Sequence, residues 1–410
     1  MLRDIRISAV VMGLLASIVG FASTFGLILA GLRGVGANDA QAAMGLTATL
    51  LATGIAGVIL PLWTRSPMTV AWSAPGAALL ASTATPAGGF PEAIGAFIIS
   101  GVLLTLAALV RPLARLVASI PLPIASAMLA GILLPLALAP VRAVAENWKL
   151  GLPIALAWLI GGRINRFLAV PFALLAFVVV TVLGTELPPG TSAALVQALG
   201  LNLALVEPVF ALESAIGIAL PLFIVTMASQ NIPGLSILRL NGYQPDAGKA
   251  FGVTGGITLL GAPFGAHAIN LAAITAAMCA GPEAAEDPAK RYWAAVFSGI
   301  GYLLFGLVAG TAALFVSIAP AILIEAVAGL ALISAFAGAI VMAFSSEHQR
   351  EAAAVTFLVA GGGLTIAGVS GAFWGLLAGL CVHLVQASRL TQRNNSATAM
   401  QDTNMRDAPR

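Results

Sequence analysis

The chain has 410 residues, of which 60% are hydrophobic and only 9% are charged, and its mean hydropathy is +1.01. Soluble domains carry about a quarter charged residues, and a water-soluble protein could not cover this much apolar surface, so a soluble enzyme is excluded. The net charge of +3 comes from scattered basic residues without interleaved aromatics, which argues against a nucleic-acid partner.

Runs of apolar residues long enough to cross a bilayer recur along the chain, and a crossing helix needs roughly 20 of them. We predict an all-α polytopic membrane protein with fourteen spans in two halves of seven. The basic residues 1–6 precede a run too long for a signal-peptide core, so the first span is expected to be retained. The predicted spans are 7–31, 42–63, 67–82, 92–110, 120–140, 150–162, 167–184, 210–233, 250–263, 266–280, 293–318, 321–344, 352–368 and 370–388. The tail 392–410 is polar and is predicted to be disordered.

The distribution of lysine and arginine orients these spans, because basic residues concentrate in cytoplasmic loops. With a cytoplasmic N-terminus, 14 of them fall in inner loops and 3 in outer loops. The inner set is Arg3, Arg6, Arg65, Arg111, Arg115, Arg163, Arg166, Arg239, Lys249, Lys290, Arg291, Arg350, Arg389 and Arg393, and the outer set is Arg33, Arg142 and Lys149. Both termini are therefore expected in the cytoplasm.

The third span of each half is interrupted in a similar way. Residues 67–76 and 263–272 both open with proline and contain further helix-breaking or small residues. An odd number of spans per half inverts one half relative to the other, and matched broken spans in inverted repeats indicate a transporter's binding site. Backbone that is not helical at mid-membrane must face protein or a watery cavity, and helices that restart there attract anions. The alternative is that glycine and proline only ease helix packing.

Polar residues near the two breaks are the candidate site residues. Imidazole groups titrate near neutral pH, so His267 could hold a coupled proton beside an anion; alternatively it only bonds the broken backbone. Gln230 and Asn231 could donate to a carboxylate, or they could bond neighbouring helices. Asn270 follows His267 by three residues and is expected on the same helix face. The remaining candidates are Phe21 and Trp72 for an aromatic ring and Ser23, Ser73, Ala74 and Ala268 for a carboxylate.

No sequence motif indicates catalysis or ATP hydrolysis, since Walker, HExxH and GxSxG patterns are all missing from the sequence. Cys279 and Cys381 are single cysteines in apolar runs, which favours neither a disulfide framework nor a metal site. We therefore expect no enzyme activity, cofactor or metal.

The motifs at 223–234 (FIVTMASQNIPG) and 263–275 (PFGAHAINLAAIT) resemble the bacterial benzoate:proton symporter family, and the resemblance extends from the first span to Arg389. That family is similar in fold to nucleobase and sulfate permeases. The resemblance implies 7+7 inverted repeats in which spans 3 and 10 begin as short extended segments. Acidic residues contact substrate in uracil permeases, whereas Gln230 and His267 stand at the matching positions here, which suits an aromatic anion better than a nucleobase.

The resemblance also implies a division into a core domain that moves against a gate domain. The expected boundaries are 1–119 and 210–319 for the core, 120–184 and 320–391 for the gate, and 185–209 for the linker between the halves. The implied function is import of benzoate or a related aromatic carboxylate with a proton, by an elevator motion in a bacterial inner membrane. A transporter of another anion or a nucleobase, and an anion channel, stay open as alternatives, and a homodimer is suggested only by analogy.

Overall fold

The computed structural model describes residues 5–110, 120–165, 167–272, 275–366 and 369–386. The predicted disordered tail at 392–410 lies outside these residues. So do six of the basic residues predicted for inner loops: Arg3, Arg111, Arg115, Arg166, Arg389 and Arg393.

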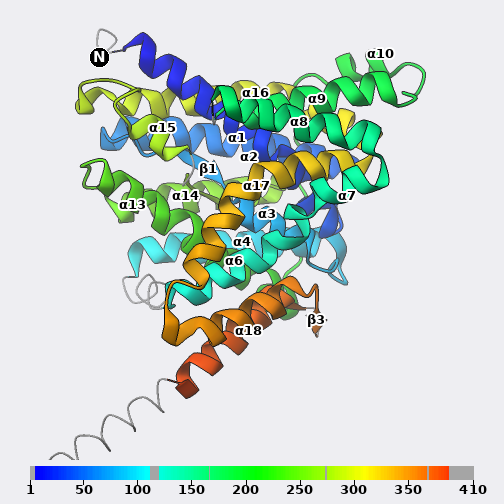
Figure 1. The fold of residues 1–410 in the computed structure, drawn as a ribbon. Helices are drawn as coiled ribbons and strands as arrows, with labels where there is room; N and C mark the ends of the chain where they lie inside the picture. The colour runs from blue at the N-terminus through cyan, green and yellow to red at the C-terminus, as the bar shows by residue number, and fades with distance from the viewer. Residues whose placement is uncertain (1–4, 111–119, 166, 273–274, 367–368, 387–410) are drawn as a thin grey trace, which may run out of the picture.

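Long apolar helices dominate the fold (Figure 1). Seven stretches of the described chain are long and apolar enough to cross a membrane. They are α1 (Ile7–Gly34), α2 (Asp39–Thr64), α4 (Gly89–Leu109), α6 with α7 (Leu122–Ala137 and Ala139–Glu146), the stretch Leu212–Leu240, η5 with α16 (Pro288–Lys290 and Tyr292–Ile318) and α17 (Ala321–Ala343). The predicted polytopic helical class is confirmed.

Shorter elements occupy the other predicted spans, so the number of membrane crossings is not fixed by helix length. They are α3 (Ala74–Ala81), α8 (Trp148–Ile164), α9 (Ala169–Gly184), α14 (Ala247–Gly261), α15 (Ala276–Ala280), α18 (Arg350–Gly361) and the helix Gly371–Gln386. Two short connecting elements are the 3-10 turns η4 (Ala262–Phe264) and η6 (Glu347–Gln349). The predicted linker 185–209 contains a short helix, α10 (Thr191–Gln197).

The stretch Leu212–Leu240 changes its helical pitch twice. It consists of α11 (Leu212–Ser214), η2 (Ala215–Ala219), α12 (Leu220–Thr226), η3 (Met227–Asn231) and α13 (Ile232–Leu240), and both η segments are π-helical. Single π-helical turns inside α-helices are frequent at functional sites. The second turn contains both Gln230 and Asn231.

Side-chain caps begin several helices where the sequence supplies the right residues. Asn38 and Gln41 form a reciprocal capping box at the start of α2, and Asp246 caps α14. Ser73 caps α3, with Pro75 in the first turn, where its missing N–H costs nothing. Ser73 therefore fixes where the third predicted span turns into a helix.

The two interrupted spans form strands, as predicted. The strands β1 (Val70–Trp72) and β2 (Ile269–Leu271) pair antiparallel, with Ala71 opposite Asn270. Figure 1 shows β1 inside the fold among α1, α2 and α14. The expectation that His267 and Asn270 share a helix face is wrong, because Asn270 lies in the extended strand β2, where neighbouring side chains alternate. A second small pair joins β3 (Thr365–Ile366) to β4 (Val369–Ser370).

The helices pack in two groups. One group contains α1–α4, α12–α16 and the β1–β2 pair, and the other contains α6–α9, α17 and α18. Contacts between the groups run mainly from α1 to α17 and α9 and from α3 and η3 to α6. The cavities described next lie along and beside this boundary.

Candidate functional site

The β1–β2 pair brings the two halves of the chain together by backbone hydrogen bonds. Beyond the paired residues, Ser73 N–H donates to the Ala268 carbonyl (2.9 Å) and Ala272 N–H donates to the Thr69 carbonyl (2.8 Å). Extended backbone is tolerated at membrane depth only where its polar groups are paired within the protein. On the edges where β1 and β2 face each other, the backbone groups of one half are paired with those of the other half.

Side chains satisfy the outer edge of β2. Ile269 N–H donates to Thr258 Oγ1 (2.9 Å), and Leu271 N–H donates to Asn231 Oδ1 (2.9 Å). Thr258 and Asn231 are fully buried. Asn231 also donates its amide to Met227 Sδ (3.2 Å). The hydrogen bonds of Asn231 therefore hold β2 in place.

His267 joins the two halves through its side chain. The ring is fully buried, and its Nε2 atom lies 3.1 Å from the Ser73 carbonyl oxygen. Because a carbonyl only accepts, Nε2 carries the hydrogen and Nδ1 is left as a lone pair when the ring is neutral. Nδ1 has no hydrogen-bond partner in the described chain. Ser73 is bonded further, since its Oγ accepts from Thr226 Oγ1 (2.9 Å) and from Gly76 N–H (3.0 Å).

A small cavity of about 50 Å³ lies beside the strands. An engineered cavity of about 150 Å³ holds benzene, so this space admits a carboxylate group or water but not a whole aromatic ring. The lining comes from α1, β1, the start of α3, η3, α16 and the residues that follow β2: Val19, Gly20, Ser23, Thr24, Ala71, Trp72, Ala74, Gln230, Ala272, Thr275 and Tyr302.

Aromatic side chains enclose the cavity on the α1–α16 side. Trp72 donates its indole N–H to Thr24 Oγ1 (2.8 Å), and its ring meets the edge of Tyr302 at 5.1 Å. Phe21 stacks on Phe305 at 4.6 Å with the rings almost parallel. These contacts fix the orientation of Trp72 and Tyr302 at the cavity wall.

The ten predicted site residues divide into two sets. The cavity wall includes Ser23, Trp72, Ala74 and Gln230. The other six surround or support it: Phe21, Ser73, Asn231, His267, Ala268 and Asn270. Contact of these residues with a substrate stays a prediction. No group of three His, Cys, Asp or Glu side chains suited to a metal occurs in the described ranges.

Three of the cavity residues that carry a side-chain hydroxyl are not among the predicted site residues: Thr24, Thr275 and Tyr302. Thr24 adjoins the predicted Ser23, and Thr275 ends the motif at 263–275, so both were within reach. Tyr302 lies in the middle of the apolar helix α16, where a single aromatic residue is usually a packing residue. Only the packing of α16 against α1 shows that Tyr302 lies at the cavity.

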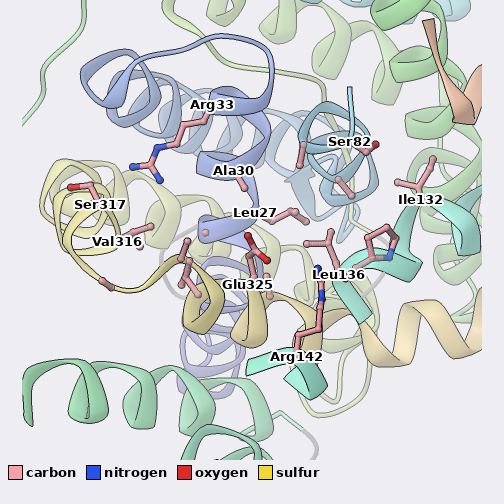
Figure 2. A pocket seen from close by; sticks show the side chains of 18 of the residues that line it. Leu27, Ala30, Arg33, Ser82, Ile132, Leu136, Arg142, Val316, Ser317 and Glu325 are labelled. Atoms are coloured by element: carbon pink, nitrogen blue, oxygen red, sulfur yellow. Dashed lines mark hydrogen bonds between the residues drawn. The ribbon is translucent and has the colours of Figure 1, made fainter. Parts of the chain in front are cut away.

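A larger cavity of about 640 Å³ opens between the two helix groups, on the same faces of α1 and α3 as the small one but nearer their C-terminal ends. We call it the vestibule. Figure 2 shows Glu325 of α17 and Arg142 of α7 on one side and Arg33 of α1 on the other. Arg33 is paired with Asp39 (2.7 Å). Arg142 donates to the Pro135 carbonyl and forms no ion pair within the described ranges.

The sequence profile of the family described as "Benzoate membrane transport protein" matches residues 3–385, which is almost the whole chain. The chain belongs to the benzoate membrane transport protein family. It is therefore a multi-span protein of a membrane transport family, as the resemblance of its two motifs implied.

The chain matches two curated relatives over nearly their full lengths. The chain is 37% identical over 373 residues to "Inner membrane protein YdcO" of Escherichia coli, covering 91% of this chain and 94% of that protein. It is 29% identical over 386 residues to the "Benzoate membrane transport protein" of Acinetobacter baylyi, covering 93% and 96%. The benzoate membrane transport family thus accounts for both halves of the chain and not for one motif alone.

Solved structures of two anion transporters share the fold. The transmembrane domain of the cyanobacterial bicarbonate transporter BicA matches with a TM-score of 0.56 and 16% identity, covering 94% of this chain and 98% of that one. SLC26A9 matches with a TM-score of 0.59 and 14% identity, covering 94% of this chain and 66% of that one. At these identities the likeness shows the fold alone, which is the inverted-repeat fold expected for this family.

Proposed function

We propose that this protein imports benzoate or a related aromatic carboxylate together with a proton across a bacterial inner membrane, with both termini in the cytoplasm. The observation that carries the proposal is the small cavity where the two broken spans meet. Broken helices of inverted repeats are where transporters of such folds bind substrate. The family membership and the name of the Acinetobacter relative support the choice of substrate class.

The substrate would bind beside β1 and β2, with Ser23, Trp72, Ala74 and Gln230 at its surface. The small cavity takes the carboxylate, and the ring needs the cavity wall at Trp72 to move outward. The vestibule supplies the access route, because its lining on α1 and α3 continues that of the small cavity. Under the predicted orientation it opens to the outside.

His267 is the proposed carrier of the coupled proton. It is buried, its Nδ1 atom lacks a protein partner in the described ranges, and its Nε2 atom is tied to the strand–helix junction at Ser73. A proton added to Nδ1 would place a charge beside a bound carboxylate, which favours loading both together. The other two histidines, His348 and His383, are not buried.

Alternating access would come from an elevator motion between two domains. The two helix groups support this division, since each packs mainly within itself and the vestibule lies between them. The core would comprise 1–119 and 210–319, the gate 120–184 and 320–391, and 185–209 would join the halves. A homodimer is a further element of this proposal.

Uptake of labelled benzoate into proteoliposomes under an imposed proton gradient tests the proposal. We expect concentrative uptake that a protonophore abolishes and that excess uracil and sulfate do not inhibit. The His267→Ala variant should lose the dependence on external pH, whereas His383→Ala should keep it. Uptake that only equilibrates benzoate would indicate a channel, and inhibition by uracil or sulfate would indicate another substrate class.

A further inference from the structure

Three buried hydroxyl groups near the small cavity have no hydrogen-bond partner in the described part of the chain. They belong to Thr275, Ser298 and Tyr302, whose exposed fractions are 4%, 1% and 0%. Thr275 and Tyr302 line the cavity directly. The Ser298 and Thr275 hydroxyls lie close enough to the Tyr302 hydroxyl to interact with it, but none of the three meets the geometry of a full hydrogen bond. Buried tyrosine hydroxyls usually find a partner, so this cluster calls for an explanation.

The position of the Tyr302 hydroxyl depends on a glycine of the facing helix. A Cβ atom at Gly20 of α1 would lie 2.1 Å from the Tyr302 oxygen, which no real contact allows. The contact of Tyr302 with Trp72 holds the ring itself. Phenylalanine would keep that ring contact and remove a buried hydroxyl that forms no hydrogen bond of good geometry within the described chain. A well-formed hydrogen bond within the protein therefore does not explain a tyrosine here.

We infer that the hydroxyls of Tyr302 and Thr275 bind the carboxylate of the substrate and so select aromatic anions over neutral aromatic molecules. This inference rests on the proposed function and names the groups that recognise the acid. Each hydroxyl can donate one hydrogen bond to a carboxylate oxygen. Bonds to an ionised acceptor are about twice as strong as neutral ones. The Gln230 amide, at the same cavity, can supply a third donor.

The arrangement suits a carboxylate better than a cation or an apolar group. No Asp or Glu belongs to the cavity lining, so nothing there repels an anion. A carboxylate without positive neighbours needs several hydrogen-bond donors to replace its hydration. If the hydroxyl donors are unpaired before binding, no hydrogen bond within the protein has to break when the substrate arrives. This arrangement favours affinity for the substrate and lowers the stability of the substrate-free protein.

Purified protein in detergent tests the inference through two measurements on each variant: the thermal unfolding temperature without ligand, and the dissociation constant for benzoate by isothermal titration calorimetry. The variants Tyr302→Phe and Thr275→Val remove one hydroxyl each with little change of shape. Thr275→Ser restores the hydroxyl. Tyr292→Phe is the matched control, because Tyr292 lies on the same helix and is also buried, but its hydroxyl accepts from Arg65 away from the cavity.

We expect Tyr302→Phe and Thr275→Val to bind benzoate about 10- to 100-fold more weakly, as for the loss of a hydrogen bond to a charged group. Their unfolding temperatures without ligand should equal or exceed that of the wild type. The dissociation constants of Thr275→Ser and Tyr292→Phe for benzoate should lie within about twofold of the wild-type value. Neither variant removes a hydrogen bond to the carboxylate, and the loss of such a bond would change the constant by more than twofold.

Two results would overturn the inference while the proposed function stands. One is that Tyr302→Phe and Thr275→Val bind benzoate as tightly as the wild type. The other is that both variants lose thermal stability without losing affinity, which would mean that the hydroxyls only bond to one another or to water. A wild-type protein that binds no benzoate in the same titration would instead refute the proposed function itself.

Discussion

The Nε2 atom of His267 lies 3.1 Å from the carbonyl oxygen of Ser73, so a titratable ring from one half of the chain is bonded to the other half where its strand becomes a helix. Around this bond, Ser73 N–H donates to Ala268 and Ser73 Oγ accepts from Thr226. Protonation of His267 and the geometry of the β1–β2 junction are therefore connected through one residue. The predictions below test other contacts that hold this junction and its surroundings in place.

Replacing Asn231 by leucine should destabilise the protein without removing a cavity side chain. The substitution leaves the buried Leu271 N–H without its acceptor, and an unsatisfied buried donor costs about 1–3 kcal/mol. Thermal unfolding in detergent measures the loss. The matched control is Asn241→Leu, because Asn241 bonds only to a carbonyl near the end of α13. An Asn231→Leu variant as stable as Asn241→Leu would contradict the structural role.

Trp72→Phe should widen the range of accepted substrates. A smaller ring enlarges the cavity wall and removes the bond to Thr24, so larger aromatic acids such as 2-naphthoate should compete better with benzoate. Differences of about one methylene in a pocket change selectivity roughly 10- to 200-fold, and we expect a shift near the lower value. Competition uptake measures it.

Trp63→Phe is the control for this prediction, because Trp63 is 58% exposed and does not line the cavity. It should leave the ratio of benzoate to 2-naphthoate uptake unchanged. An unchanged ratio in Trp72→Phe as well would place the ring of the substrate elsewhere.

Gly299→Ala should destabilise the packing of α16 on α2. A Cβ atom at Gly299 would lie 2.6 Å from the backbone carbon of Gly57, and membrane helices rely on such small residues for close approach. Overpacking costs about 1–3 kcal/mol. Gly256→Ala on α14 meets nothing within 4 Å, so it should be neutral or stabilising by up to about 1 kcal/mol. The unfolding temperature should therefore fall for Gly299→Ala and stay unchanged or rise for Gly256→Ala, and equal shifts would be inconsistent with this interface.

Arg142→Gln should slow the capture of substrate from outside. Arg142 is a cation of the vestibule without an ion-pair partner in the described chain, whereas Arg33 is paired with Asp39. A positive group at a cleft raises the local concentration of anions. We expect KM for benzoate to rise about 2- to 10-fold with little change in kcat, and its dependence on salt to weaken.

Lys149→Gln provides the comparison for Arg142, because Lys149 is exposed on α8 and does not line the vestibule. Its KM should stay within experimental error of the wild type. The same increase of KM in both variants would point to net charge as the cause, with no role for the vestibule.

The strand pair was predictable from the sequence because its signals are local. Proline, glycine and small residues interrupt the apolar runs at 67–76 and 263–272, and their matching positions in two halves indicated that the breaks face each other. Trp72 and Ala74 were found at the cavity for the same reason, and Gln230 was found because an amide is costly in lipid unless it is partnered. The family comparison then confirmed the class that the two motifs implied.

The rest of the site depends on contacts between distant residues, which no local pattern reveals. Tyr302 reaches the cavity only because Gly20, 282 positions earlier in the chain, leaves room for its hydroxyl. Asn231 looked like a substrate ligand because amides are rare in membrane helices, yet its bonds go to the backbone of β2 and to Met227. Arg142 was predicted only as a basic residue of an outer loop, and the packing of α17 and α7 places it together with Glu325 in one vestibule.

The location of a bound aromatic acid tests the central claim most directly. Crystals of the protein grown with 4-iodobenzoate would place the iodine by anomalous scattering and the carboxylate by density. The account predicts the carboxylate beside β1 and β2, within hydrogen-bond distance of the Tyr302 and Thr275 hydroxyls, with the iodine directed away from them. An iodobenzoate bound only at the lipid-facing surface, with the cavity at Trp72 and Gln230 unchanged, would contradict it.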